Sequence, residues 1–176
     1  MTGGKHKGRI LYSPKNEKVR PTSDKVRESV FNILNIFEGC TFFDLFAGAG
    51  SVGLEAWSRG AKTVILIDSD IQLCRKNVQI FQNPSLKVIK GQLPHILKRV
   101  KGQGDFIFMD PPFTHPELTE KTLEMLALYP HLYAKDAIFI VQQSQFYKTI
   151  ERNGYCLIKE KVYGLNRLLF YKRNSV

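Results

Sequence analysis

Short apolar runs alternate with amphipathic stretches along most of this chain, from residue 40 to residue 142. Apolar runs of about four to eight residues are typical of buried strands, and apolar residues three or four positions apart are typical of helices. Strands that alternate with helices in this way build a parallel sheet with helices on both faces. The pattern predicts strands at 40–46, 63–67, 86–89, 106–109 and 137–142, and helices at 51–59, 71–81, 93–100 and 117–128.

The chain departs from this alternation at both ends. Polar residues 22–24 precede apolar residues at helical spacing, which predicts an N-terminal helix that ends at Gly39. Extended runs at 155–161 and 167–171 are joined by a segment too short for a helix, which predicts an antiparallel hairpin at the sheet edge. The predicted fold is therefore α/β, a doubly wound, mostly parallel, seven-stranded Rossmann-like sheet with an antiparallel C-terminal hairpin.

The charge of the chain is concentrated near its N-terminus. Lys and Arg number 26 against 16 Asp and Glu, for a formal net charge of +10, and eight of the basic residues lie within the first 27 positions. We therefore expect residues 1–21 to form a basic arm and residues 22–176 a single domain. Such an arm suits a polyanion such as nucleic acid, although a solvated tail or attraction to anionic lipid are alternatives. The candidate RNA-contacting residues are Lys5, Lys7, Arg9, Arg20 and Arg27.

Several classes of protein are disfavoured by what the sequence lacks. No apolar run reaches the roughly 18 residues of a membrane span, and no signal segment is recognisable at the start. The three cysteines are far apart, with no C-x-x-C pair, and the four histidines have no partners at metal-ligand spacing. We therefore expect a cytoplasmic protein that uses neither a membrane nor a metal.

A glycine-rich segment, Asp44–Gly53 (DLFAGAGSVG), follows the first predicted strand and opens the next helix. Gly48 and Gly50 permit a tight turn and a close approach to a ligand, and Gly53 permits close helix–strand packing. Asp68 follows 20 residues after Gly48, at the end of the second predicted strand, where a carboxylate can accept hydrogen bonds from ribose hydroxyls. The segment predicts a nucleoside site, and its glycine spacing alone also fits a dinucleotide.

The acidic residue Asp44 helps to decide between a nucleoside without phosphate and a dinucleotide. A carboxylate beside the glycine loop repels a pyrophosphate and attracts an ammonium group. S-adenosylmethionine carries a ribose, an adenine, an ammonium and a sulfonium, and it has no phosphate. The charge therefore favours S-adenosylmethionine over NAD as the cofactor.

A second motif, Asp110–Phe113 (DPPF), ends the predicted strand 106–109 and should face the same crevice, because ligands of open α/β sheets bind at the carboxyl ends of the strands. An exocyclic amino group is a poor nucleophile, since its lone pair is delocalised into the ring. Acceptors on the Asp110 carboxylate and the Pro111 carbonyl would hold that group toward tetrahedral geometry on a stiff loop. Phe113 offers a face on which a flipped-out base can stack. The candidate catalytic residues are Asp110, Pro111, Pro112 and Phe113.

With these motifs the chain resembles the class I S-adenosylmethionine-dependent N-methyltransferases, whose mark is [DN]-P-P-[FYW]. More narrowly, it resembles the RsmD family, bacterial enzymes that methylate N2 of a guanine in 16S rRNA. The resemblance covers nearly the whole chain. It is carried by Gly4–Arg9 (GKHKGR), Arg20–Asn32 (RPTSDKVRESVFN), Asp44–Glu55 (DLFAGAGSVGLE), and Tyr163–Gly164 with Phe170–Tyr171.

The resemblance implies roles for these segments. It implies that 44–53, including Phe46, and Asp68 bind S-adenosylmethionine, that 110–113 hold the target guanine, and that 20–32 form part of the active-site rim. Many methyltransferases contact the adenine amino group with an acidic or Asn residue after the third strand, where this chain offers Gln92. The implied partner is 16S rRNA, within the small ribosomal subunit or an assembly intermediate, and we expect a monomer.

The residues also bear on which base is used. Guanine presents two adjacent donors, N1–H and N2–H₂, which one carboxylate such as Asp110 can accept, whereas adenine presents a donor beside an acceptor and suits Asn better. This favours N2 of guanine. The alternatives are an N-methyltransferase acting on DNA adenine or a protein amide, a non-catalytic RNA-binding module, and an NAD oxidoreductase. The short chain argues against a DNA or protein N-methyltransferase. The intact motifs argue against a non-catalytic module, and the lack of a hydride-transfer acid argues against an NAD oxidoreductase.

Overall fold

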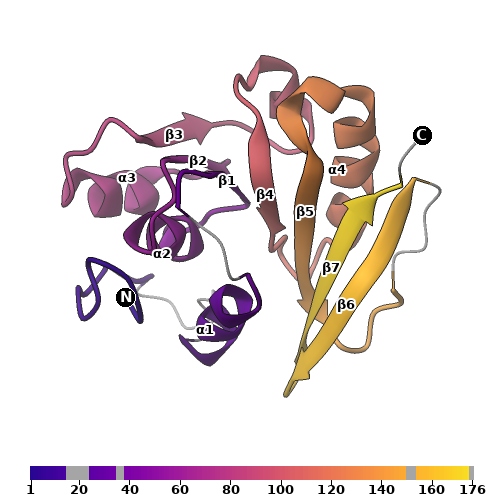
Figure 1. The fold of residues 1–176 in the computed structure, drawn as a ribbon, viewed down its shortest axis with the longest axis horizontal. Coiled ribbons are helices and arrows are strands. Elements are labelled where there is room, and N and C mark those ends of the chain that lie inside the picture. The colour runs from indigo at the N-terminus through magenta and orange to yellow at the C-terminus, as the bar shows by residue number, and fades with distance from the viewer. Residues whose placement is uncertain (15–23, 35–37, 150–153, 175–176) are drawn as a thin grey trace.

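The computed structural model of the protein describes residues 1–14, 24–34, 38–149 and 154–174. These residues form a seven-stranded sheet with the strand order β3-β2-β1-β4-β5-β7-β6 (Figure 1). The strands are β1 (Thr41–Leu45), β2 (Thr63–Asp68), β3 (Leu86–Lys90), β4 (Gly104–Met109), β5 (Tyr133–Ser144), β6 (Tyr155–Tyr163) and β7 (Asn166–Arg173). The α-helices are α1 (Asp24–Ile33), α2 (Ser51–Ser58), α3 (Gln72–Gln79) and α4 (Glu117–Leu128), and the 3₁₀ helices are η1 (His95–Arg99) and η2 (Pro130–Leu132).

The sheet has the predicted doubly wound topology. Strands β1 to β5 are parallel, and β7 pairs antiparallel with β5 on one side and with the edge strand β6 on the other. From β1 the chain builds outward through β2 to β3, and it then returns to β4 on the opposite side of β1. Ligands of open α/β sheets bind at the carboxyl ends of the strands beside such a reversal. The topology therefore predicts that a ligand binds at the ends of β1 and β4.

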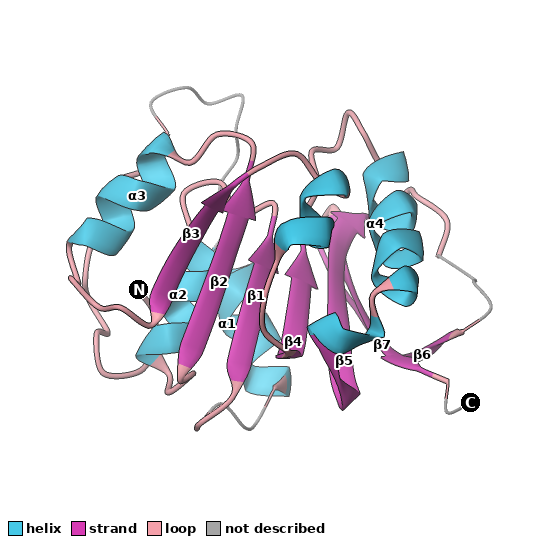
Figure 2. Cartoon of the chain, turned by 90° about the horizontal axis from the view of Figure 1, so that it is seen from above, coloured by secondary structure: helices cyan, strands magenta, loops and turns pink. Residues whose placement is uncertain are grey.

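Helices cover both faces of the sheet, with α4 in front of it and α1 and α2 behind it in Figure 2. Successive side chains of a strand point to opposite faces, so the strand β1 contributes to both cores. Phe42 packs in the same core cluster as Leu54 of α2. Phe43 packs in the other cluster, with Leu97 of η1 and Leu123 of α4. Burial on both faces explains why the central strands are nearly continuous apolar runs.

The first 14 residues pack against α2 and α3. The backbone N–H and the hydroxyl of Thr2 both donate to the carboxylate of Glu55, each over 2.9 Å. The ring of His6 stacks on Trp57, with centroids 4.7 Å apart and planes inclined by 11°. The first part of the predicted basic arm thus lies along the surface of the domain. Residues 15–21 of the arm lie outside the described part of the chain.

Three elements differ from their predicted form. The N-terminal helix α1 ends at Ile33 and Leu34 lies outside it, short of the predicted end at Gly39. The segment 93–100, predicted as a regular helix, contains the short 3₁₀ helix η1, in which the N–H of Leu97 donates to Pro94 O and that of Val100 to Leu97 O. Only a few residues separate η1 from β4, which leaves no room for a longer helix. Strand β5 begins four residues before the predicted position 137, because Tyr133 also pairs with Gly104 of β4.

Two observations concern only the residues that the structure describes. None of their helices is both long enough and apolar enough to cross a bilayer. Their His, Cys, Asp and Glu side chains form no group of three or more that could hold a metal ion.

Candidate active site

Asp44 lies beneath the glycine loop, close to the end of the strand that precedes that loop. It is the fourth residue of β1, and its side chain is buried, with a relative exposure of 2%. The N–H of Gly53, in the first turn of α2, donates to Asp44 Oδ2 over 2.7 Å. A Cβ atom on Gly53 would lie 2.9 Å from Leu66 Cδ2 and 3.1 Å from Asp44 Oδ2. The absence of a side chain on Gly53 therefore permits both the helix–strand packing predicted for it and the hydrogen bond.

The loop between β1 and α2 uses the left-handed backbone region three times. Phe46, Gly48 and Gly50 have φ angles of 67°, 53° and 79°. A Cβ atom on Gly50 would approach Leu66 Cδ2 to 2.9 Å and Cys74 Sγ to 3.0 Å, whereas a Cβ atom on Gly48 would meet nothing within 4 Å. The loop is thus packed against the core at Gly50 and open at Gly48, where its backbone can meet a ligand.

These two glycines form a matched pair for mutation. We expect Gly50→Ala to lower the free energy of unfolding by about 2–4 kcal/mol, because left-handed strain adds to overpacking against two buried side chains. We expect Gly48→Ala to cost only the strain, about 1–2 kcal/mol. Urea unfolding of both variants measures the difference, and equal losses would contradict the packing argument.

Asp68 ends β2, and backbone donors hold its carboxylate beside the loop. Its Oδ2 accepts from Gly48 N over 2.8 Å, and its Oδ1 accepts from Asp70 N over 3.0 Å. Just after the next strand, β3, the N–H of Gly91 donates to the Asp68 carbonyl over 2.9 Å, and Gln92 follows it. The structure therefore brings the two predicted ribose and adenine contacts, Asp68 and Gln92, to the same edge of the sheet as the loop.

Asp110 follows β4 and completes a group of three carboxylates. Burial raises the pKa of Asp44 to about 7; the Gly53 hydrogen bond opposes this, and the charges of Asp110 and Asp68 raise it further. The mutual influence follows from the topology, since β1 lies between β2 and β4 and all three strands point the same way. Three carboxylates at one edge of the sheet disfavour an anionic ligand and favour a cationic one.

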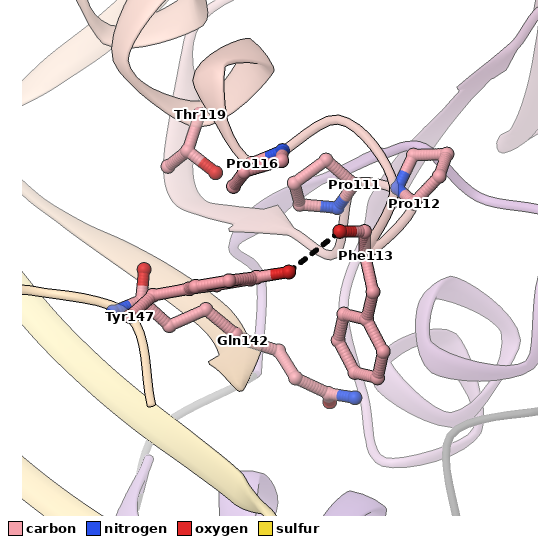
Figure 3. A pocket seen from close by; sticks show the side chains of 8 residues that line it. Pro111, Pro112, Phe113, Pro116, Thr119, Gln142 and Tyr147 are labelled. Atoms are coloured by element: carbon pink, nitrogen blue, oxygen red, sulfur yellow. Dashed lines mark hydrogen bonds between the residues drawn. The ribbon is translucent and has the colours of Figure 1, made fainter. Parts of the chain in front are cut away.

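The Pro111–Phe113 part of the loop after Asp110 borders a hollow (Figure 3). Pro111 is buried, while 47% of the Phe113 side chain is exposed. The Tyr147 hydroxyl donates to the Phe113 carbonyl over 2.6 Å, and Arg167 of β7 in turn donates to the Tyr147 carbonyl. The hollow is lined by Pro111, Pro112, Phe113, Pro116, Thr119, Gln142, Gln143 and Tyr147.

Among these lining residues, Gln142, Gln143 and Tyr147 were missed in the sequence, as were Pro116 and Thr119 at the start of α4. The first two occupy the carboxyl end of β5, where two amides follow the apolar run Ala137–Val141. A polar pair at the carboxyl end of a buried strand is a signal that could have found them, because that edge of the sheet carries the ligand. Tyr147 has no comparable signal, since its contact with the loop depends on how the β5–β6 connection folds back.

Asn77, on α3, was also missed, and it joins the N-terminal segment to the glycine loop. Its side chain is fully buried. Its Oδ1 accepts from Tyr12 N over 2.8 Å, and its Nδ2 donates to Tyr12 O and to Ala49 O, over 3.0 and 2.9 Å. One side chain thereby fixes the position of the N-terminal segment relative to the loop.

The predicted RNA-contacting residues divide into three groups. Lys5, Lys7 and Arg9 are exposed on the N-terminal segment, which is held to α2 by a hydrogen bond from Lys5 N to Ser58 O over 2.7 Å. Arg27 is a correction, because it is buried, with its guanidinium 2.7 Å from Asp24 and 3.7 Å from Glu55. It is an internal ion-pair partner and presents no charge to a polyanion. Arg20 lies outside the described residues.

Comparison with known proteins agrees with this geometry. Residues 1–172 match the model of the family described as Conserved hypothetical protein 95. The chain belongs to this family. It is the RsmD family that the motifs indicated, so the resemblance read from the sequence is confirmed.

Relatives of known name support the assignment over nearly their full lengths. The chain is 30% identical over 179 residues to ribosomal RNA small subunit methyltransferase D of Escherichia coli K12, covering 99% of this chain and 90% of the relative. It is 32% identical over 180 residues to the protein of the same name from Haemophilus influenzae, covering 98% and 92%.

Solved structures agree with the fold. The putative methyltransferase yhhF of Escherichia coli aligns with a TM-score of 0.84 and 32% identity, over 99% of this chain and 97% of that one. A hypothetical protein of Thermus thermophilus aligns with a TM-score of 0.80 and 25% identity, over 97% of both chains. This member of the RsmD family therefore shares its architecture with solved structures over nearly its whole length.

Proposed function

We propose that this protein transfers a methyl group from S-adenosylmethionine to the exocyclic N2 of a guanine in 16S rRNA of the small ribosomal subunit. The observation that carries the proposal is that Asp68 and Asp110 lie close enough to Asp44 for their charges to raise its pKa, at the edge of the sheet where the Pro111–Phe113 loop begins. The names of the relatives, ribosomal RNA small subunit methyltransferase D, support the RNA substrate and the subunit. We place the protein in the cytoplasm, acting as a monomer on the subunit or on an assembly intermediate.

The residues present suit S-adenosylmethionine. Asp68 accepts from the N–H groups of Gly48 and Asp70 and, over 3.3 Å, from the Ser69 hydroxyl. One ribose hydroxyl can use the remaining lone pair of Oδ2, and a second can replace the Ser69 hydroxyl on Oδ1. The buried carboxylate of Asp44 gains most from a cationic neighbour, because desolvation now disfavours its charge. Gln92 would take the adenine amino group, and the open backbone at Gly48 leaves room for the ligand. When bound, the cofactor supplies an electrophilic methyl group on a sulfonium.

The Asp110–Phe113 loop would hold the base. Asp110 and the Pro111 carbonyl accept hydrogen bonds from the amino group and turn its lone pair out of conjugation. Phe113 stacks on the base, a contact that is worth about 1–3 kcal/mol in other proteins. The proton that the amino nitrogen loses passes to Asp110 or to water. Catalysis therefore rests on orientation and on electrostatic complementarity to the sulfonium, and it needs no covalent intermediate.

Transfer of labelled methyl groups to candidate substrates tests this proposal. The protein is incubated with unmodified small ribosomal subunits, with naked 16S rRNA and with DNA. We expect label in rRNA, and the ratio between the two RNA forms shows which one is the substrate. Label in DNA or in protein, or tight cofactor binding without any transfer to RNA, would contradict the proposal.

The exposed cations of the N-terminal segment give a second test. We expect the triple variant Lys5→Ala, Lys7→Ala, Arg9→Ala to bind RNA more weakly and to flatten the dependence of log K on log salt by about two, since each phosphate contact contributes about 0.7–0.9. The charge-matched control replaces Lys98, Arg99 and Lys101, which are exposed near the amino end of β4. Filter binding over a range of salt concentrations measures both slopes. Equal slopes would show that the segment makes no phosphate contacts.

A further inference from the structure

The side chain of Gln142 on β5 is buried without being satisfied. Its relative exposure is 4%, and its Oε1 has no hydrogen-bond partner among the described residues. The neighbouring Gln143, exposed to 6%, differs in this respect because its Nε2 donates to Lys148 O over 3.1 Å. A buried amide oxygen without a partner costs folding free energy, and few such groups persist in native proteins. Gln142 is therefore a candidate for a ligand contact.

The sheet places this amide next to the motif that holds the base. Val141 pairs with Met109 in the register of β5 and β4. Gln142 is the next residue of β5, and Asp110 directly follows the end of β4. Adjacent strands lie about 4.8 Å apart. The hollow that Gln142 lines is also lined by the prolines of the DPPF loop and by Phe113 (Figure 3). In that view the extended side chain of Gln142 ends beside the Phe113 ring.

We infer that Gln142 is a specificity-determining residue, which accepts a hydrogen bond from N1–H of the target guanine through Oε1. The inference rests on the proposed function and deepens it. In guanine the atom beside the 2-amino group is the donor N1–H, whereas in adenine the atom beside the 6-amino group is the acceptor N1. An acceptor next to Asp110 thus matches guanine and opposes adenine. With N1–H bound by Gln142, the carboxylate of Asp110 accepts from one N–H of the amino group that is methylated, and the Pro111 carbonyl accepts from the other.

The test removes the proposed hydrogen bond first by changing the base of the substrate and then by changing Gln142 of the protein. The target guanosine, located by the methyl-transfer assay, is replaced by 2-aminopurine riboside, which keeps the 2-amino group and has a bare acceptor at N1. We expect the wild-type protein to prefer guanosine by about tenfold or more in kcat/KM, as befits a hydrogen bond of about 1.4 kcal/mol. In Gln142→Leu this preference falls toward one, while the affinity for S-adenosylmethionine is unchanged.

Two further variants separate recognition from folding. Gln143→Leu makes the same change one residue further on, where the amide is already bound within the protein, and it keeps the wild-type preference even where overall activity drops. Gln142→Glu retains an acceptor oxygen and also keeps the preference for guanosine. A Gln142→Leu protein that still prefers guanosine as strongly as the wild type overturns the inference and leaves the proposed function intact. A wild-type protein that methylates neither substrate overturns the proposed function itself.

Discussion

Asp110→Asn is expected to lower the rate of methyl transfer by about 10²–10³-fold, the range seen when one preorganised polar group is removed from an active site. The substitution keeps the shape of the side chain but replaces one carboxylate oxygen by an NH₂ group. That group cannot accept a hydrogen bond, and the oxygen that remains is neutral, so the amino group of the base is held more weakly and its lone pair is oriented less well. We expect the affinity for S-adenosylmethionine to change by only a few-fold, because Gly48, Asp68 and Asp44 are unaltered.

The control for this experiment is Asp136→Asn, an identical change at an exposed position of β5. Single-turnover kinetics with saturating cofactor isolate the chemical step, and calorimetric titration measures cofactor binding. Transfer by Asp110→Asn at close to the wild-type rate would show that the hydrogen-bond account of base activation is wrong.

Asp44→Asn is expected to stabilise the free protein above neutral pH and to weaken cofactor binding. Burial raises the pKa of Asp44 from an ordinary value of 3.8 to about 7, so the folded state holds this proton more tightly than the unfolded state does. The stability contributed by the protonated side chain is fully present below about pH 4 and is lost as the pH rises through 7. At pH 8 the neutral amide restores it, by at most about 4 kcal/mol for a difference of this size.

The same substitution removes the negative charge that the cofactor's ammonium group would meet. We expect the affinity for S-adenosylmethionine at pH 8 to fall by about ten- to a hundredfold, in line with about 1.5–3 kcal/mol for a hydrogen bond to a charged group. In the wild-type protein the affinity should likewise weaken as the pH falls through 7. Urea unfolding at pH 5 and pH 8 and calorimetric titration at both values measure these effects. A change in stability that is equal at the two pH values would contradict the account.

Much of this site could be predicted from the sequence because parallel strands deliver their carboxyl ends to one edge. Asp44, Asp68 and Asp110 each lie at or close to the end of an apolar run, and the topology alone brings them together. Gly53 could be assigned a packing role for a similar reason, since a helix that starts so soon after a strand must approach the sheet closely. Local pattern and connectivity are sufficient for such residues.

Other features depend on contacts between distant segments, which no local pattern encodes. Arg27 belongs to a basic stretch of sequence, yet the fold buries it against Glu55 of α2. Asn77 is an ordinary polar residue of an amphipathic helix, and its three hydrogen bonds exist only because the N-terminal segment returns to α3. Gln142 and Gln143 are alike in the sequence, and only the fold gives Gln143 Nε2 a hydrogen-bond partner while leaving Gln142 Oε1 without one among the described residues. These distinctions arise from tertiary packing.

Identification of the methylated nucleoside tests the central claim most directly. Unmodified small ribosomal subunits and naked 16S rRNA are incubated with the protein and S-adenosylmethionine, and the RNA is digested to nucleosides and analysed by chromatography with mass spectrometry. The account predicts one new product, N2-methylguanosine, which is absent when Asp110→Asn replaces the wild-type protein over the same short incubation. N6-methyladenosine, or a methylated guanosine that forms equally fast with Asp110→Asn, would contradict it.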